Sequence, residues 1–129
     1  MDSSATDQTR IRPRVLVAED DPSIRLTIKY ILIDEGYEVV FAEDGREALE
    51  LARKRPPDVM LLDQMMPRLS GGEVLRELRG DPSTSSIPVV MLTGLAGGDA
   101  TEWPGARFIA KPFDPVTLIN SIKSIVDGH

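Results

Sequence analysis

The sequence predicts one α/β domain built as a doubly wound, five-stranded parallel sheet. Short apolar runs alternate five times with segments whose apolar residues repeat at helical spacing. These runs are apolar throughout, which is typical of strands that are buried on both faces in a parallel sheet covered by helices. The chain of 129 residues is long enough for one such domain and its core.

The first strand is predicted at residues 15–18, and a helix follows it closely. Asp21 and Pro22 suit the start of this helix, because aspartate is a favoured N-cap residue and proline fits the first helical position. Gly36 ends it. The apolar face of the helix consists of Ile24, Ile28, Ile31 and Leu32. The arginines that alternate ahead of the strand are expected to be solvated: Arg10, Arg12 and Arg14.

The second and third strands are predicted at residues 39–42 and 59–62, and each is followed by a helix. Asp44 and Glu47 form a capping-box-like pair at the start of the first of these helices. The buried side of this helix is Ala48, Leu49 and Ala52. The next helix has the same kind of start, and its capping pair and buried residues are Ser70, Glu73, Val74, Leu75 and Leu78.

The fourth strand is predicted at residues 89–92 and a short fifth strand at residues 108–110. Between them, the segment Gly94–Gly105 contains four glycines and a proline. The helix expected there is short or missing, because glycine costs about 1 kcal/mol and proline about 3 kcal/mol in a helix interior. Asp114 and Pro115 then start the last helix, whose apolar face is Leu118, Ile119, Ile122, Ile125 and Val126.

The composition argues against several classes of function. A net charge of -6 disfavours a nucleic-acid surface, because phosphate repulsion is not offset. There is no cysteine, and His129 is the only histidine, which argues against thiolate or histidine metal sites and a catalytic triad. No apolar run approaches the roughly 20 residues that span a bilayer, and the polar N-terminus has no signal-peptide core. We expect a cytoplasmic protein without membrane partners and with a disordered tail at residues 1–12.

Five polar side chains stand where the predicted strands end. Glu19 and Asp20 follow the first strand, Asp63 follows the third, Thr93 the fourth and Lys111 the fifth. Each of them alone is compatible with a turn, a cap or an exposed charge. Together they lie at the carboxyl edge of one parallel sheet, which is where open α/β folds bind their ligands. Their shared position therefore predicts a functional site.

The residue types at this edge favour phosphoryl transfer. Three carboxylates held close together repel one another, and a hard divalent cation such as Mg²⁺ relieves that repulsion. A carboxylate beside the ion can accept a phosphoryl group and form an acyl phosphate, so Asp63 is the candidate phosphoacceptor. Lys111 can neutralise charge on the transferring oxygens, and Thr93 can donate a hydrogen bond to one of them.

This combination of motifs resembles the receiver domain of two-component response regulators, over about residues 13–127. The matching segments are Glu19-Asp20, Asp63-Gln64-Met65-Met66-Pro67, Thr93 and Lys111-Pro112-Phe113. The resemblance implies the flavodoxin-like strand order 2-1-3-4-5 and a stand-alone, single-domain regulator. It also implies that Asp63 takes its phosphoryl group from a histidine kinase or a histidine phosphotransfer protein.

The same resemblance assigns metal ligands. It implies that Mg²⁺ is bound by the carboxylates of Asp20 and Asp63 and by the backbone carbonyl of Met65. It implies that Glu19 acts largely through water. Receivers catalyse only their own phosphorylation and slow dephosphorylation, so the resemblance implies that this protein is not an enzyme that turns over a separate substrate. Output would pass to a downstream protein that the sequence does not name, or along a phosphorelay.

The resemblance further implies a cis peptide bond between Lys111 and Pro112. It also implies that Thr93 and Phe108 form a switch pair, in which the hydroxyl moves toward the phosphoryl group and the ring follows it inward. The alternative for Phe108 is a plain core residue. Met65 and Leu95 flank the site with apolar side chains, so we expect a slowly hydrolysing phosphoryl-aspartate.

The interval from Thr93 to Lys111 is shorter than usual for the family. The missing length falls in the helix between the fourth and fifth strands, which many receivers use with the fifth strand and last helix for dimerisation or output. We expect the segment Gly94–Gly105 to be mobile and to become ordered on phosphorylation. The oligomeric state stays open, because the surface that many receivers use for dimerisation is altered here.

Three alternative functions remain open at this stage. A flavodoxin-like flavin binder would use Gly94–Gly98 as a phosphate loop, although the acidic edge argues against it. An aspartyl-phosphate phosphohydrolase would carry a second aspartate at the position of Met65. A phosphorylation-independent docking module would keep the fold without the chemistry.

Overall fold

The computed structural model describes residues 12–66, 68–94 and 105–127. Residues 1–11 of the predicted tail and almost all of the Gly94–Gly105 segment, in which a short or missing helix was expected, lie outside these residues. The strands are β1 (Arg14–Ala18), β2 (Glu38–Ala42), β3 (Val59–Asp63), β4 (Val89–Thr93) and β5 (Ala106–Ala110). The helices are α2 (Pro22–Asp34), α3 (Gly45–Lys54), α4 (Gly71–Arg79) and α5 (Pro115–Val126). None of these described helices is both long and apolar enough to cross a bilayer.

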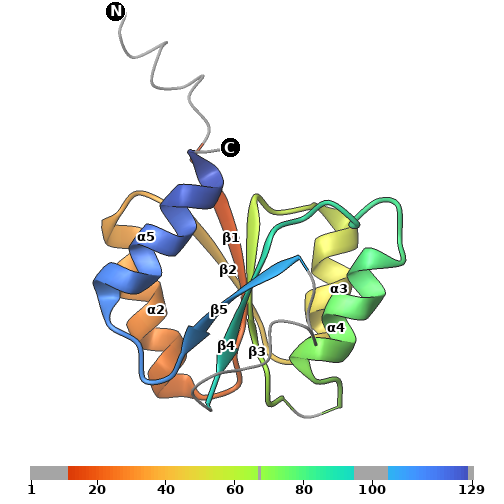
Figure 1. Cartoon of the computed structure of the whole chain (residues 1–129), viewed down its shortest axis with the longest axis horizontal. Coiled ribbons are helices and arrows are strands. Elements are labelled where there is room, and N and C mark those ends of the chain that lie inside the picture. Colours follow the sequence, from red (N-terminus) through yellow and green to blue (C-terminus); the bar gives the residue numbers. More distant parts are fainter. Residues whose placement is uncertain (1–11, 67, 95–104, 128–129) are drawn as a thin grey trace, which may run out of the picture.

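The five strands form one parallel sheet in the order β2-β1-β3-β4-β5. Helices α2 and α5 cover one face of this sheet, and α3 and α4 cover the other (Figure 1). The predicted doubly wound class and the strand order that the resemblance implied are both confirmed. All strands therefore point their carboxyl ends to the same edge.

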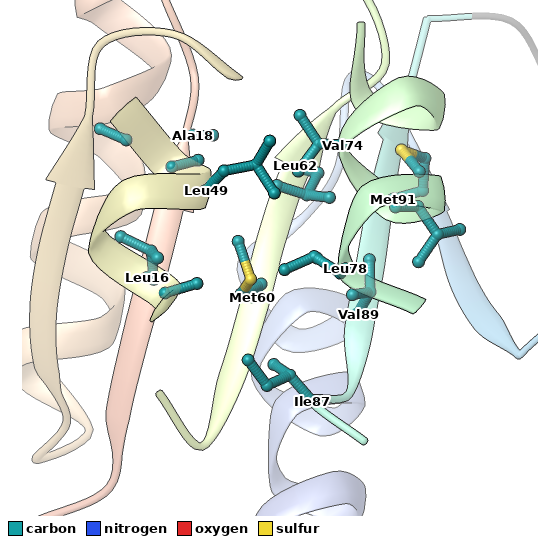
Figure 2. Close-up of a cluster of buried hydrophobic side chains, with 14 residues drawn as sticks. Leu16, Ala18, Leu49, Met60, Leu62, Val74, Leu78, Ile87, Val89 and Met91 are labelled. Carbon is teal, nitrogen blue, oxygen red and sulfur yellow. The ribbon is translucent and has the colours of Figure 1, made fainter. Parts of the chain in front are cut away.

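The core lies in two layers, one on each face of the sheet. Successive residues of a strand point to opposite faces. Leu16 and Met60 accordingly join the cluster under α3 and α4 (Figure 2), whereas Val17 and Leu61 join the cluster under α2 and α5. Because both faces are covered, β1, β3 and β4 are buried at every position, which explains their uninterrupted apolar runs.

The predicted helix starts are confirmed. The Asp21 side chain accepts hydrogen bonds from the backbone N–H groups at the start of α2. Ser70 and Glu73 form a complete capping box on α4, in which each side chain accepts from the backbone N–H of the other residue. Gly36 has a φ of +91° after the end of α2, a conformation that suits glycine.

The expectation that Arg14 is solvated is wrong. This residue opens β1 and is only 8% exposed. Its backbone N–H donates to Asp58 Oδ2 at 2.7 Å, and its guanidinium donates to the backbone carbonyl of Arg55. Burial is tolerated because these partners satisfy its polar groups.

Candidate functional site

Three carboxylates meet at the carboxyl edge of the sheet. Asp63 is the last residue of β3, and Glu19 and Asp20 directly follow β1, the strand paired with β3. One oxygen atom of each carboxylate lies within 4.8 Å of the others. Glu19 and Asp63 are buried, whereas Asp20 is exposed. The cluster thus has a buried floor and one carboxylate that faces solvent.

Lys111 connects two of these carboxylates. Its Nζ lies 2.9 Å from Glu19 Oε1 and 3.1 Å from Asp63 Oδ1. The residue follows β5, and its backbone N–H donates to the carbonyl of Thr93 at 2.6 Å. The peptide bond between Lys111 and Pro112 is cis. The ammonium group therefore lies between the carboxylate that follows β1 and the one that ends β3, although Lys111 itself follows β5, the outermost strand of the sheet.

Burial and neighbouring charges shift the pKa values of this group. Burial raises the pKa of Glu19 to about 7, and the carboxylate of Asp63 adds to the increase, while the ammonium group of Lys111 opposes it. For Lys111, burial lowers the pKa, but Glu19 and Asp63 together outweigh burial and raise it. The site therefore holds a firmly protonated lysine and a carboxyl that titrates near neutral pH.

The loop after Asp63 holds the aspartate in place. The backbone N–H of Met65 donates to Asp63 Oδ1 at 3.2 Å, and the N–H of Gly71 donates to the carbonyl of Gln64 at 3.1 Å. A Cβ atom on Gly71 would lie 2.6 Å from the carbonyl oxygen of Asp63. Sequence reasoning missed Gly71, and its only sequence signal was a glycine just after the capping residue Ser70.

Thr93 and Phe108 lie on β4 and β5. Thr93 ends β4 and is 1% exposed, and it stands one residue beyond Leu92, the residue paired with Asp63. Phe108 is partly buried and packs against the core cluster under α3 and α4. Its core contact is therefore present, and the switch role of the pair stays a prediction.

The donor set suits a hard cation. Glu19, Asp20 and Asp63 offer carboxylate oxygens, which Mg²⁺ prefers over nitrogen or sulfur ligands. Among the described residues, Glu19 Oε1 is buried without a hydrogen bond of good geometry, and its contact with Lys111 is an ion pair. The direct ion pair was not part of the sequence prediction, which gave Glu19 a role through water. The predicted residues are nevertheless compatible with a magnesium site.

Fold and site together define an α/β domain of the flavodoxin-like class with an acidic, lysine-bridged centre. The sequence matches the response regulator receiver domain over residues 15–123. The chain belongs to this family, whose members are signalling modules of two-component systems.

Relatives of known name have different lengths. PilH from Pseudomonas aeruginosa is 35% identical, and the match covers 89% of this chain and 98% of PilH. The response regulator PleD from Caulobacter vibrioides is 42% identical, but the match covers 87% of this chain and only 26% of PleD. The receiver unit is therefore nearly the whole of one relative and a quarter of the other.

Solved structures share the fold. The chemotaxis protein CheY4 from Vibrio cholerae has a TM-score of 0.82 and 33% identity, with 89% of this chain and 99% of that chain covered. The receiver domain of a sensor histidine kinase from Pseudomonas aeruginosa has a TM-score of 0.84 and 26% identity, with 92% and 100% covered. That structure holds a magnesium ion in its active-site cleft.

Proposed function

We propose that this protein is a phosphorylatable response regulator that accepts a phosphoryl group on Asp63 in a Mg²⁺-dependent reaction. The observation that carries the proposal is the position of Lys111 Nζ, within 3.1 Å of carboxylates that follow β1 and end β3. Such a cation next to an acceptor carboxylate is what the charge of a transferring phosphoryl group requires. Family membership supports the same function.

The phosphodonor is a histidine kinase or a histidine phosphotransfer protein. An Asp63 carboxylate oxygen attacks the phosphorus atom of a phosphohistidine, an O–P bond forms and the P–N bond breaks. The electron pair of the broken bond returns to the histidine nitrogen, and the ring takes up a proton from solvent and leaves as neutral imidazole. The product is an acyl phosphate on Asp63.

The other side chains have supporting roles. Lys111 pairs with the transferred phosphoryl oxygens, and the Thr93 hydroxyl donates a hydrogen bond to one of them. The groups that hold Mg²⁺ are the carboxylates of Asp20 and Asp63 and the backbone carbonyl of Met65. Bound there, the ion supplies positive charge to the phosphoryl oxygens. The relative with magnesium in its cleft supports this assignment.

Glu19 acts in this scheme mainly by holding Lys111. It is fully buried and forms the shorter of the two ion pairs with the ammonium group. The backbone N–H of Asp21 donates to its other oxygen at 3.2 Å, which fixes the carboxylate. After phosphorylation, Thr93 and Phe108 change conformation together and alter the surface that a downstream protein or the next relay component binds.

Intact-mass analysis after incubation with acetyl phosphate tests the proposal. We expect one added phosphoryl group that requires Mg²⁺ and disappears in Asp63→Asn. Asp34→Asn is the matched control, because Asp34 is an exposed carboxylate at the end of α2, and it should be modified like the wild type. If no condition adds a phosphoryl group, the result contradicts the proposal and favours the alternative of a docking module that works without phosphorylation.

A further inference from the structure

The loop between β3 and α4 contains a residue in the left-handed conformation. Among the described residues, Arg68 is the only one other than glycine with a positive φ, and its φ is 74°. An L-residue adopts this conformation at an energetic cost, so the surrounding structure must stabilise it. The same loop carries Met65, whose N–H contacts Asp63.

An ion pair connects Arg68 to the start of α3. Arg68 Nη1 lies 3.1 Å from Asp44 Oδ2. The other oxygen of Asp44 caps α3 by accepting a hydrogen bond from the Glu47 N–H at 2.9 Å. One carboxylate therefore serves both the helix and the loop. The groove around the guanidinium is strongly acidic, and its carboxylates are Glu43, Asp44, Glu47 and Glu50.

A second contact joins the same two segments. A Cβ atom on Gly45, the first residue of α3, would lie 2.7 Å from the carbonyl oxygen of Leu69 and 2.8 Å from its Cβ. The start of α3 and the loop are thus in direct backbone contact next to the ion pair. The loop is fixed to α3 at two neighbouring residues, Arg68 and Leu69.

We propose that Arg68 is a positioning residue for Asp63. Its ion pair with Asp44 holds the loop in the conformation in which the Met65 N–H hydrogen-bonds Asp63 Oδ1. That bond fixes the carboxylate in the position from which it would contact a metal ion and the incoming phosphoryl group. The inference rests on the proposed function only for the role of Asp63, because the orientation of the carboxylate exists without phosphorylation.

Three substitutions at Arg68 separate its effects. Arg68→Ala removes the ion pair but keeps the left-handed cost, and Arg68→Lys keeps the charge. Arg68→Gly removes both the ion pair and the cost. Asp44→Ser breaks the pair from the other side while retaining an N-cap side chain for α3. Arg46→Ala is the control, because it removes an exposed arginine that lines the same groove.

The readouts are hydrogen exchange at the Met65 amide, measured by NMR in the metal-free protein, and the Mg²⁺ Kd from calorimetry. We expect Arg68→Ala and Asp44→Ser each to speed exchange and raise the Kd by about two- to fivefold, the range for an exposed ion pair. The double variant should be no worse than either single one, and Arg68→Lys should resemble the wild type. Arg68→Gly should be more stable than Arg68→Ala, because glycine adopts a positive φ without that cost, but its Met65 amide should still exchange fast, because the ion pair is missing.

Met65 exchange that is unchanged in Arg68→Ala overturns the proposal. Faster exchange with an unchanged Mg²⁺ Kd also overturns it, because Arg68 is then only structural. Failure of the proposed function looks different, since the wild type would then take no phosphoryl group from acetyl phosphate. Comparing Met65 amide exchange in Arg68→Ala and the wild type still tests the proposal in that case, because it requires no phosphorylation.

Discussion

Glu19 carries the strongest pH signature at the scale of single residues. Its pKa in the folded protein is about 7, above the ordinary value of 4.5, because burial and Asp63 outweigh Lys111. Between these values Glu19 binds more protons in the folded state than in the unfolded state, so its contribution to stability falls as pH rises from about 4.5 to about 7. Chemical denaturation of the metal-free protein across this range measures the trend.

Glu19→Gln is the comparison for that trend. It has no titrating group at position 19, so its stability relative to the wild type should increase as pH rises toward 7. A stability difference that stays constant over this range would contradict the raised pKa. The effect belongs to the metal-free protein, because a bound cation compensates the carboxylate charge.

Gly71 is a second residue at which a substitution should have a clear effect, because it leaves no room for a side chain. A side chain at this position meets the carbonyl oxygen of Asp63 at 2.6 Å and Met91 Sδ at 2.7 Å. Gly71→Ala should therefore destabilise the protein by about 1–3 kcal/mol, as overpacking does, and should lower phosphorylation because the backbone of Asp63 must shift. Thermal unfolding and intact-mass analysis measure the two effects.

Gly80→Ala is the matched control. Gly80 follows α4 with an ordinary φ of -86°, and a Cβ atom there would make only normal contacts at 3.6 Å and beyond. We expect little change in stability or phosphorylation. Equal losses of stability and phosphorylation in Gly71→Ala and Gly80→Ala would contradict a specific role for the close contact between Gly71 and Asp63.

At the scale of elements, the capping box of α4 connects helix stability to the site. The helix starts directly after the loop that carries Met65, and Ser70 and Glu73 close its first turn. Ser70→Ala should cost about 1 kcal/mol in the free energy of unfolding, whereas Ser70→Asp should retain most of it, because aspartate is also a good N-cap. Urea denaturation distinguishes the two, and equal losses would argue against a capping role.

The elements themselves followed from local patterns in the sequence. Apolar runs located all five strands, and Asp21, Ser70 and Asp114 marked helix starts because capping depends on neighbouring residues only. Arg14 was misjudged because its burial depends on Asp58 and Arg55, which lie far along the chain. Local pattern cannot show a partner of that kind.

The candidate site likewise has features that local sequence patterns predict and features that depend on contacts between distant residues. The carboxyl-edge position of Glu19, Asp63 and Lys111 could be predicted, because parallel strands end at a common edge. The pairing of Lys111 with Glu19 as well as Asp63 could not, since it depends on side-chain geometry. The left-handed conformation of Arg68 was equally hidden, because neither residue type nor spacing distinguishes it from an exposed arginine with an ordinary negative φ.

At the scale of the whole molecule, Mg²⁺ should act as a stabilising ligand. The three clustered carboxylates come from two strands, so binding requires the folded sheet. A ligand that binds only the folded state at about 100 times its Kd adds about 2.7 kcal/mol to the free energy of unfolding. Thermal unfolding with and without Mg²⁺ should show this gain, and Asp20→Asn should lose most of it while Asp34→Asn retains it.

The place of β5 as the last strand along the chain also orders events as the protein leaves the ribosome. The carboxylates of Glu19 and Asp63 emerge well before Lys111, which is synthesised only after β5. Until β5 docks against β4, the nascent domain holds acidic groups without the lysine that later lies between them. Docking of the last strand therefore both completes the sheet and brings a positive charge between two of the three clustered carboxylates, so a chain truncated before β5 lacks both contributions to stability.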